Sequence, residues 1–228
     1  MVNRYEAIRA RRLREAKLKE GDKWKEILAL IRGHPETRVM GREQLLPAYS
    51  FVERMFPAVA PAIRSMVVYK NDNTAFCRRI GIPKEAGGAF LVRASAILIC
   101  YTGLMSAPVP DDVVVVHEML HYVAQLMGSR FTSSVSEEDF AYAKAIPYLL
   151  EQGAKEDWIR QRYLLPYYWS LEMLKCIREQ HGPVQESLYK ELARKVALER
   201  CEMMIRQEKD GSVVDEERVP MSRFEMIG

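Results

Sequence analysis

One segment constrains this chain more than any other: residues 113–121 read Val-Val-Val-Val-His-Glu-Met-Leu-His, two histidines and a glutamate inside an apolar run. On a helix, residues four apart project about 40° from one another, so the imidazoles of His117 and His121 face one point. Burying two imidazoles and a carboxylate costs free energy unless each group finds a partner. Because a metal ion is such a partner, we expect a buried helix that carries a metal site.

The three polar residues of this segment have distinct predicted roles. His117 and His121 are the expected metal ligands; without a metal they would be two histidines satisfied within the core. Glu118 lies about 100° around the helix from His117, near the metal but off the ligand face. A general base that acts on water beside a metal ion stands in that place. Imidazole and carboxylate ligands with an open fourth position favour Zn²⁺, and iron or manganese are the alternatives.

The region around this motif, residues 96–150, resembles the zincin metallopeptidases. Metzincins continue with a glycine and a third histidine, at positions that are Ala124 and Met127 here. The resemblance is therefore to gluzincins, in which a downstream glutamate completes the site. Glu138-Asp-Phe-Ala141 is similar to the Glu-x-x-Ala segment of ImmA/IrrE-type gluzincins, which implies Glu138 as the third ligand. Many gluzincins place an aspartate four residues later to orient a histidine, and the chain departs from that pattern with Tyr142.

Helical phase also favours Glu138 over its neighbour Glu137. The face of Glu138 continues through Ala141 and Ala145, which are small enough to pack on another helix, whereas the face of Glu137 continues through Lys144. Glu137 is therefore expected to face solvent, and it stays the alternative ligand. Both residues could also be only acids favoured by the dipole at a helix N-terminus.

The remaining pattern predicts an α+β, zincin-like fold, with a small, mostly antiparallel sheet followed by a helix-rich half that carries the metal site. Strands are expected at 65–70, 74–80, 89–93 and 96–101. Helices are expected at 3–32, 42–55, 111–125, 155–164, 167–181 and 184–208, and another should begin at a capping box that starts with Ser136. Three segments follow: a basic helical arm at 1–40, a metallopeptidase domain at 41–183, and a C-terminal helix with a polar tail at 184–228.

Composition indicates the cellular compartment in which the protein is expected. No segment of the 228 residues reaches the roughly 18 consecutive apolar residues of a membrane-spanning helix. The first residues are charged and do not resemble a signal peptide, so we expect a cytoplasmic protein with no membrane partner. The four cysteines are far apart in the sequence and are expected to be reduced thiols.

These observations predict a zinc-dependent metallopeptidase that hydrolyses peptide or protein substrates, with Glu118 as general base. The strand expected at 96–101 is a candidate to pair with an extended substrate by strand addition. The segments that resemble gluzincins also resemble phage-encoded metallopeptidase-like proteins. The alternative is a catalytically inactive protein, stabilised by zinc, that serves as a structural or interaction component. Nucleic-acid binding by the arm is the weaker alternative, because residues 4–26 contain nine Lys or Arg against five Asp or Glu.

Overall fold

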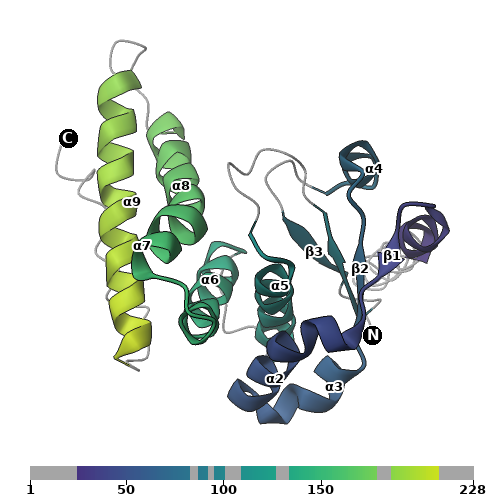
Figure 1. Cartoon of the computed structure of the whole chain (residues 1–228). Helices are drawn as coiled ribbons and strands as arrows, with labels where there is room; N and C mark the ends of the chain where they lie inside the picture. The colour runs from purple at the N-terminus through teal and green to yellow at the C-terminus, as the bar shows by residue number, and fades with distance from the viewer. Residues whose placement is uncertain are drawn as a thin grey trace, which may run out of the picture. The chain divides into compact units, whose positions relative to one another are not determined.

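The structure is a computed structural model that describes residues 25–82, 87–91, 95–100, 109–126, 134–178 and 186–210 (Figure 1). The chain divides into two compact units, residues 1–141 and 142–228. A small sheet with helices lies in the first unit, and the described part of the second is helical, which confirms the α+β class. In the described ranges, every helix is too short or too polar to cross a membrane. The expected arm lies outside the described residues up to residue 24, and residues 25–33 are helical.

The sheet has four strands: β1 (Arg38–Val39), β2 (Val67–Lys70), β3 (Gly88–Leu91) and β4 (Ala96–Ile99). Their order is β1-β2-β4-β3. The β1–β2 and β3–β4 pairs are antiparallel, while β2 and β4 are parallel. The sheet is therefore mixed, with antiparallel pairing at both edges and one parallel pair in the middle. All four residues of β4 are buried, as expected for a strand with neighbours on both sides.

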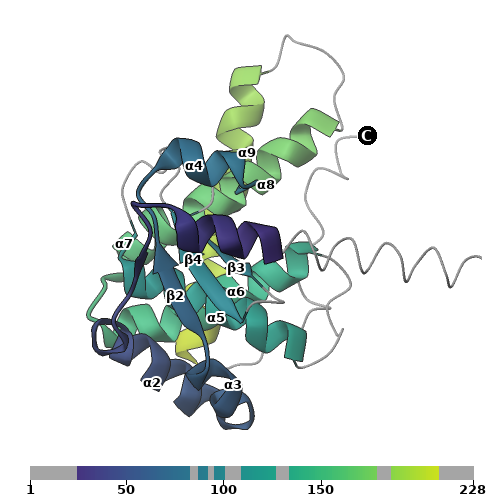
Figure 2. The same ribbon diagram turned by 90° about the vertical axis from the view of Figure 1, so that its right-hand side faces the viewer.

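Helices cover both faces of the sheet within the first unit. Helix α5 (Asp111–Leu126) packs against β3 and β4 on one face. The helix of residues 25–33 and helix α4 (Thr74–Arg79) lie over the other face (Figures 1 and 2). The core on that second face contains Ile31, Tyr69, Phe76, Cys77, Ile80, Ile82, Leu91, Ala96, Leu98 and Cys100. The sheet is thus the middle layer of three, and α5 carries both histidines of the motif, His117 and His121.

Helix α4 corrects a prediction, because residues 74–80 were expected to form a strand. The side chain of Asn73 accepts a hydrogen bond from the backbone N–H of Phe76 at 2.9 Å, which is the geometry of a helix N-cap. Asn73 itself is held by a buried neighbour, since its backbone N–H donates to the Asn71 side-chain oxygen at 2.8 Å. The Asn-Asp-Asn sequence therefore begins a helix and does not connect two strands.

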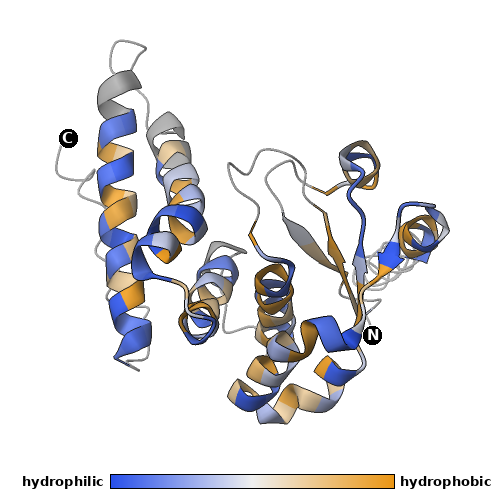
Figure 3. Cartoon of the chain, in the orientation of Figure 1, coloured by the Kyte–Doolittle hydropathy of each residue, from blue (hydrophilic) through white to orange (hydrophobic). Residues whose placement is uncertain are grey.

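Helix α5 begins and ends within one residue of its predicted bounds. Its four consecutive valines, residues 113–116, are all buried. Tertiary packing therefore outweighs the poor helix propensity of β-branched residues. Figure 3 shows that α5 is apolar along most of its length. The predicted helix at 42–55 is also present, as a 3₁₀ turn at Arg42–Leu45 followed by α2 (Leu46–Met55), which packs on α5. A second 3₁₀ turn, Pro57–Val59, and α3 (Ala60–Arg64) complete this region.

Helix α6 spans Ser134–Glu151 and begins two residues earlier than predicted. Ser136 therefore lies inside the helix, and the expected capping box is wrong. In the first unit, the ring of Phe140 lies 6.2 Å from that of Phe56, which follows α2. This contact places Phe140 of α6 beside the end of α2, and α2 itself packs on α5.

The second unit contains the predicted C-terminal helices. They are α7 (Glu156–Trp158), a π-helical segment at Ile159–Leu164, α8 (Leu165–Arg178) and α9 (Glu186–Lys209). Helices α8 and α9 pack side by side (Figure 1). The buried hydroxyl of Tyr168 donates to the sulfur of Met204 at 3.2 Å, and the guanidinium of Arg200 lies 4.5 Å from the centre of the Tyr168 ring. Both contacts of Tyr168 join α8 to α9.

Candidate metal centre

Three side chains converge between α5 and the first turns of α6. The Nε2 atoms of His117 and His121 lie 3.2 Å apart. The carboxylate of Glu138 approaches both, with one oxygen 3.4 Å from His117 Nε2 and the other 3.4 Å from His121 Nε2. These three residues form a group whose donor atoms are close enough to hold one metal ion. Two helices thus bring together the three ligands that the sequence predicts.

The group is partly withdrawn from solvent. Each imidazole is 13% exposed and the Glu138 side chain is 38% exposed. The partial burial strengthens interactions among the charges, while more than a third of the Glu138 side chain stays in contact with water. Such a site can exchange a small ligand with solvent.

Glu137 makes a contact that the sequence did not predict. One of its carboxylate oxygens lies 3.1 Å from His121 Nδ1, the ring nitrogen opposite the one that faces Glu138. Glu137 is therefore not a solvent-facing acid, as its helical phase suggested. A carboxylate directly before the predicted ligand was the available signal, but phase alone does not show which neighbour it reaches.

The electrostatics of this cluster favour a cation at its centre. Burial by itself would raise the pKa of Glu138, but hydrogen bonds from both imidazoles hold it well below its usual range. Burial opposes charge on His121, yet its hydrogen bond to Glu138 and the nearby charge of Glu118 raise its pKa to about 9. The cluster therefore attracts positive charge, and a metal ion bound at its centre would supply that charge.

Glu118 is the most buried carboxylate of the site. It is 8% exposed, and burial raises its pKa above the ordinary value for glutamate, against the opposing charges of His117 and His121. The backbone N–H of Phe90 in β3 hydrogen-bonds its carboxylate. Glu118 is absent from the converging donors, so it stands beside the metal group and not within it. This is the placement predicted for a general base.

A glycine lets β3 approach Glu118. A Cβ atom added at Gly88 would lie 2.7 Å from Val114 Cγ1 in α5 and 3.3 Å from the Oε1 atom of Glu118. A larger residue there requires a shift of the Val114 side chain, of the strand or of the helix. Gly88 therefore keeps β3 close enough for the Phe90 amide to reach the carboxylate.

We predict that Gly88→Ala lowers the free energy of unfolding by about 1–3 kcal/mol, because the methyl group overpacks the contact between β3 and α5. Denaturant unfolding measures this loss. Gly33→Ala is the matched control, since a Cβ at Gly33 meets no atom within 4 Å. Equal stability of the two variants would contradict the close packing of β3 on α5.

A cavity of about 220 Å³ opens next to the metal group. It is lined by Phe90, Glu118, His121, Gln125, Glu137 and Glu138. The ring of Phe90 packs on that of Tyr122 with their centres 5.0 Å apart, so one wall of the cavity is aromatic. The cavity therefore joins the predicted base and two of the three predicted ligands in one space.

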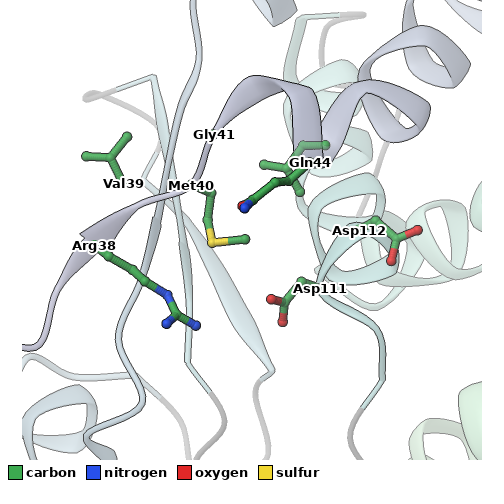
Figure 4. A pocket seen from close by; sticks show the side chains of 8 residues that line it. Arg38, Val39, Met40, Gly41, Gln44, Asp111 and Asp112 are labelled. Carbon is green, nitrogen blue, oxygen red and sulfur yellow. The ribbon is translucent and has the colours of Figure 1, made fainter.

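A larger cavity, of about 550 Å³, lies at the start of α5. Arg38, Met40 and Asp111 point into it from the β1 edge and from the first turn of the helix (Figure 4). The carboxylate of Asp111 is bound by Lys70 Nζ, at 2.7 and 2.9 Å from its two oxygens. This cavity contains neither the histidines nor Glu118, so we do not place the chemistry there.

The sheet edge nearest the site is β3, which corrects an expectation about substrate binding. The segment Ala96–Tyr101 was expected to pair with an extended substrate. Strand β4 (Ala96–Ile99) is paired on both sides, with β2 and with β3, so it offers no open edge. Strand β3 is an edge strand: it pairs with β4 on one side, and no described strand pairs with its other side.

The other sequence-based expectations for α6 have mixed outcomes. Ala141 and Ala145 are fully buried, as the phase of the Glu138 face predicted. Lys144 was expected to mark a solvent face, but its amine binds Glu208 of α9 at 2.9 Å. Tyr142, where gluzincins carry an aspartate, stacks on Tyr167 with ring centres 4.4 Å apart. Tyr142 is therefore a packing residue of the second unit.

The chain was also compared with known proteins. No family model, curated protein or solved structure matches it.

Proposed function

We propose that the protein is a zinc-dependent metallopeptidase of the gluzincin type. The supporting observation is the convergence of the three predicted ligands: the two imidazole Nε2 atoms lie 3.2 Å apart, and each lies 3.4 Å from a different oxygen of the Glu138 carboxylate. A tetrahedral zinc ion with bonds of about 2.0–2.1 Å requires neighbouring donor atoms about 3.3–3.4 Å apart. Two imidazole nitrogens and one carboxylate oxygen are also a donor set that zinc prefers.

The number of ligands favours catalysis over a structural role. The converging group supplies three protein residues, His117, His121 and Glu138. Catalytic zinc sites keep three protein ligands and an open position, whereas structural sites are usually closed by four. The cavity beside the group gives that open position a way to water and substrate.

In the proposed reaction, His117, His121 and Glu138 would hold the ion, which would act as a Lewis acid that acidifies water and polarises a carbonyl. Glu118 accepts the proton of the attacking water as the new carbon–oxygen bond forms. It then delivers that proton to the amine nitrogen as the peptide bond breaks. The burial that raises the pKa of Glu118 suits it to this exchange, since it must both take and release a proton.

The edge of β3 that pairs with no described strand is the proposed place for an extended peptide. A strand added there would lie next to Phe90, whose amide holds Glu118. The scissile carbonyl would then be close to both the base and the metal group. We therefore expect peptide or protein substrates bound in extended conformation.

Metal removal tests this proposal. The purified chain should contain about one zinc ion per molecule by elemental analysis. A chelator should abolish cleavage of a peptide library and lower the melting temperature, because the ion binds the folded chain in preference to the unfolded one. Added zinc should restore both properties. Zinc-dependent stability without cleavage of any peptide would favour the structural alternative, and a chain that folds equally well and binds no metal would refute both.

A further inference from the structure

We infer that Glu137 is a positioning residue, which fixes the tautomer and the orientation of His121 so that Nε2 faces the metal. The inference rests on the proposed zinc site. It assigns to Glu137 a role different from ligation and from a helix-terminal acid.

The two carboxylates of α6 approach opposite nitrogens of one imidazole. Glu137 lies 3.1 Å from Nδ1 of His121, and Glu138 lies 3.4 Å from Nε2. A neutral imidazole carries one N–H, and the nitrogen without it has the lone pair that binds a metal. Donation of the Nδ1–H to Glu137 therefore leaves the Nε2 lone pair directed toward Glu138 and His117.

Adjacency in α6 allows this arrangement. Successive residues of a helix project about 100° apart, so neighbouring glutamates reach different sides of a group that lies in front of them. The Glu137 side chain is 27% exposed and the imidazole 13%, so water screens this contact less than it would a surface pair. The first turns of α6 thus supply both a metal ligand and the group that holds another ligand in place.

The geometry argues against the two other roles for Glu137. It is absent from the group of donors that converge on one point, so its carboxylate is not placed to bind the same ion. An acid that acts through the helix dipole alone would need no side-chain partner. Glu137 instead makes a contact with one defined ring nitrogen.

The experiment measures the zinc dissociation constant of the full chain by competition with a chromophoric chelator. Glu137→Ala should weaken zinc binding about 10–100-fold, the usual effect of losing a carboxylate that holds a ligating histidine. Glu137→Gln has a similar shape and an oxygen that accepts the Nδ1–H, so it should recover part of the loss. Glu43→Ala, which removes an exposed acid from the first turn of a 3₁₀ helix, is the control and should bind as the wild type does.

Cobalt substitution gives a second readout. The visible spectrum of bound Co²⁺ reports the number and type of ligands, so Glu137→Ala at saturating Co²⁺ should keep the wild-type spectrum. Circular dichroism of the metal-free variants verifies that each one folds. If Glu137→Ala does not fold, the zinc affinity and cobalt spectrum of Glu137→Gln test the positioning role.

The outcomes separate this inference from the proposed function. Wild-type chain that binds no zinc would overturn both. Zinc binding by the wild type with unchanged affinity in Glu137→Ala and Glu137→Gln would overturn only the positioning role. Loss of the metal together with an altered cobalt spectrum in Glu137→Ala would make Glu137 a ligand, which also overturns it.

Discussion

Replacement of Glu118 by glutamine is expected to abolish peptide hydrolysis and to leave the zinc content of the chain unchanged. The amide keeps the shape of the carboxylate but cannot accept a proton from water, and a general base typically contributes about 10²–10⁴-fold to the rate. The metal should stay, because Glu118 is not among the converging donors. Cleavage of a fluorogenic peptide and elemental analysis of the same preparation test both parts.

Stability provides the control for this variant. Burial already disfavours the charged form of Glu118, so a neutral amide in its place should not destabilise the fold. The melting temperature of metal-loaded Glu118→Gln should therefore equal or exceed that of the wild type. Full activity in the variant would exclude Glu118 as the base, and loss of zinc would place it among the ligands.

Replacement of Glu138 by alanine is expected to have the largest effect on metal binding. Two neutral imidazoles would then bind a dication without a carboxylate ligand to compensate its charge. Loss of a residue that holds a metal ligand in place typically weakens metal binding by up to roughly 100-fold. The zinc dissociation constant of Glu138→Ala should rise by more than that. Competition with a chelator, on the same scale as for the Glu137 variants, measures the difference.

The comparison between the two glutamates identifies the third ligand. Glu138→Ala should be much weaker in zinc binding than Glu137→Ala, although the two substitutions remove the same group from neighbouring positions. A reversed order would show that α6 presents Glu137 to the ion. The gluzincin proposal would survive that result, while the assignment of Glu138 would not.

The sequence was most informative where chemistry and periodicity coincide. Two histidines at a spacing of four in a valine-rich run predicted a buried helix, and α5 matches that prediction within one residue. Phase along α6 selected Glu138 over Glu137, and the structure brings Glu138 to both histidines. In both cases the signal lies within one helix, where the side-chain direction follows from the spacing alone.

The predictions failed where the outcome depends on a partner from another part of the chain. Residues 74–80 have strand-forming composition, but the cap at Asn73 and the apolar core beneath Phe76 favour a helix. Phase could not show the contact between Glu137 and His121, because it depends on how two helices meet. The two-residue strand β1 is too short to produce a periodic pattern.

The three predicted ligands come from two helices, and this affects how the chain folds. His121 and Glu138 are separated by 17 positions, so an ion held by both would be a cross-link that closes the chain between them. Loop closure of this length costs conformational entropy, which the ion would offset in the folded state alone. Helix α5 is buried by the sheet and by α2 whether or not the ion is present. Metal loss should therefore release the first turns of α6 while the packing of α5 persists.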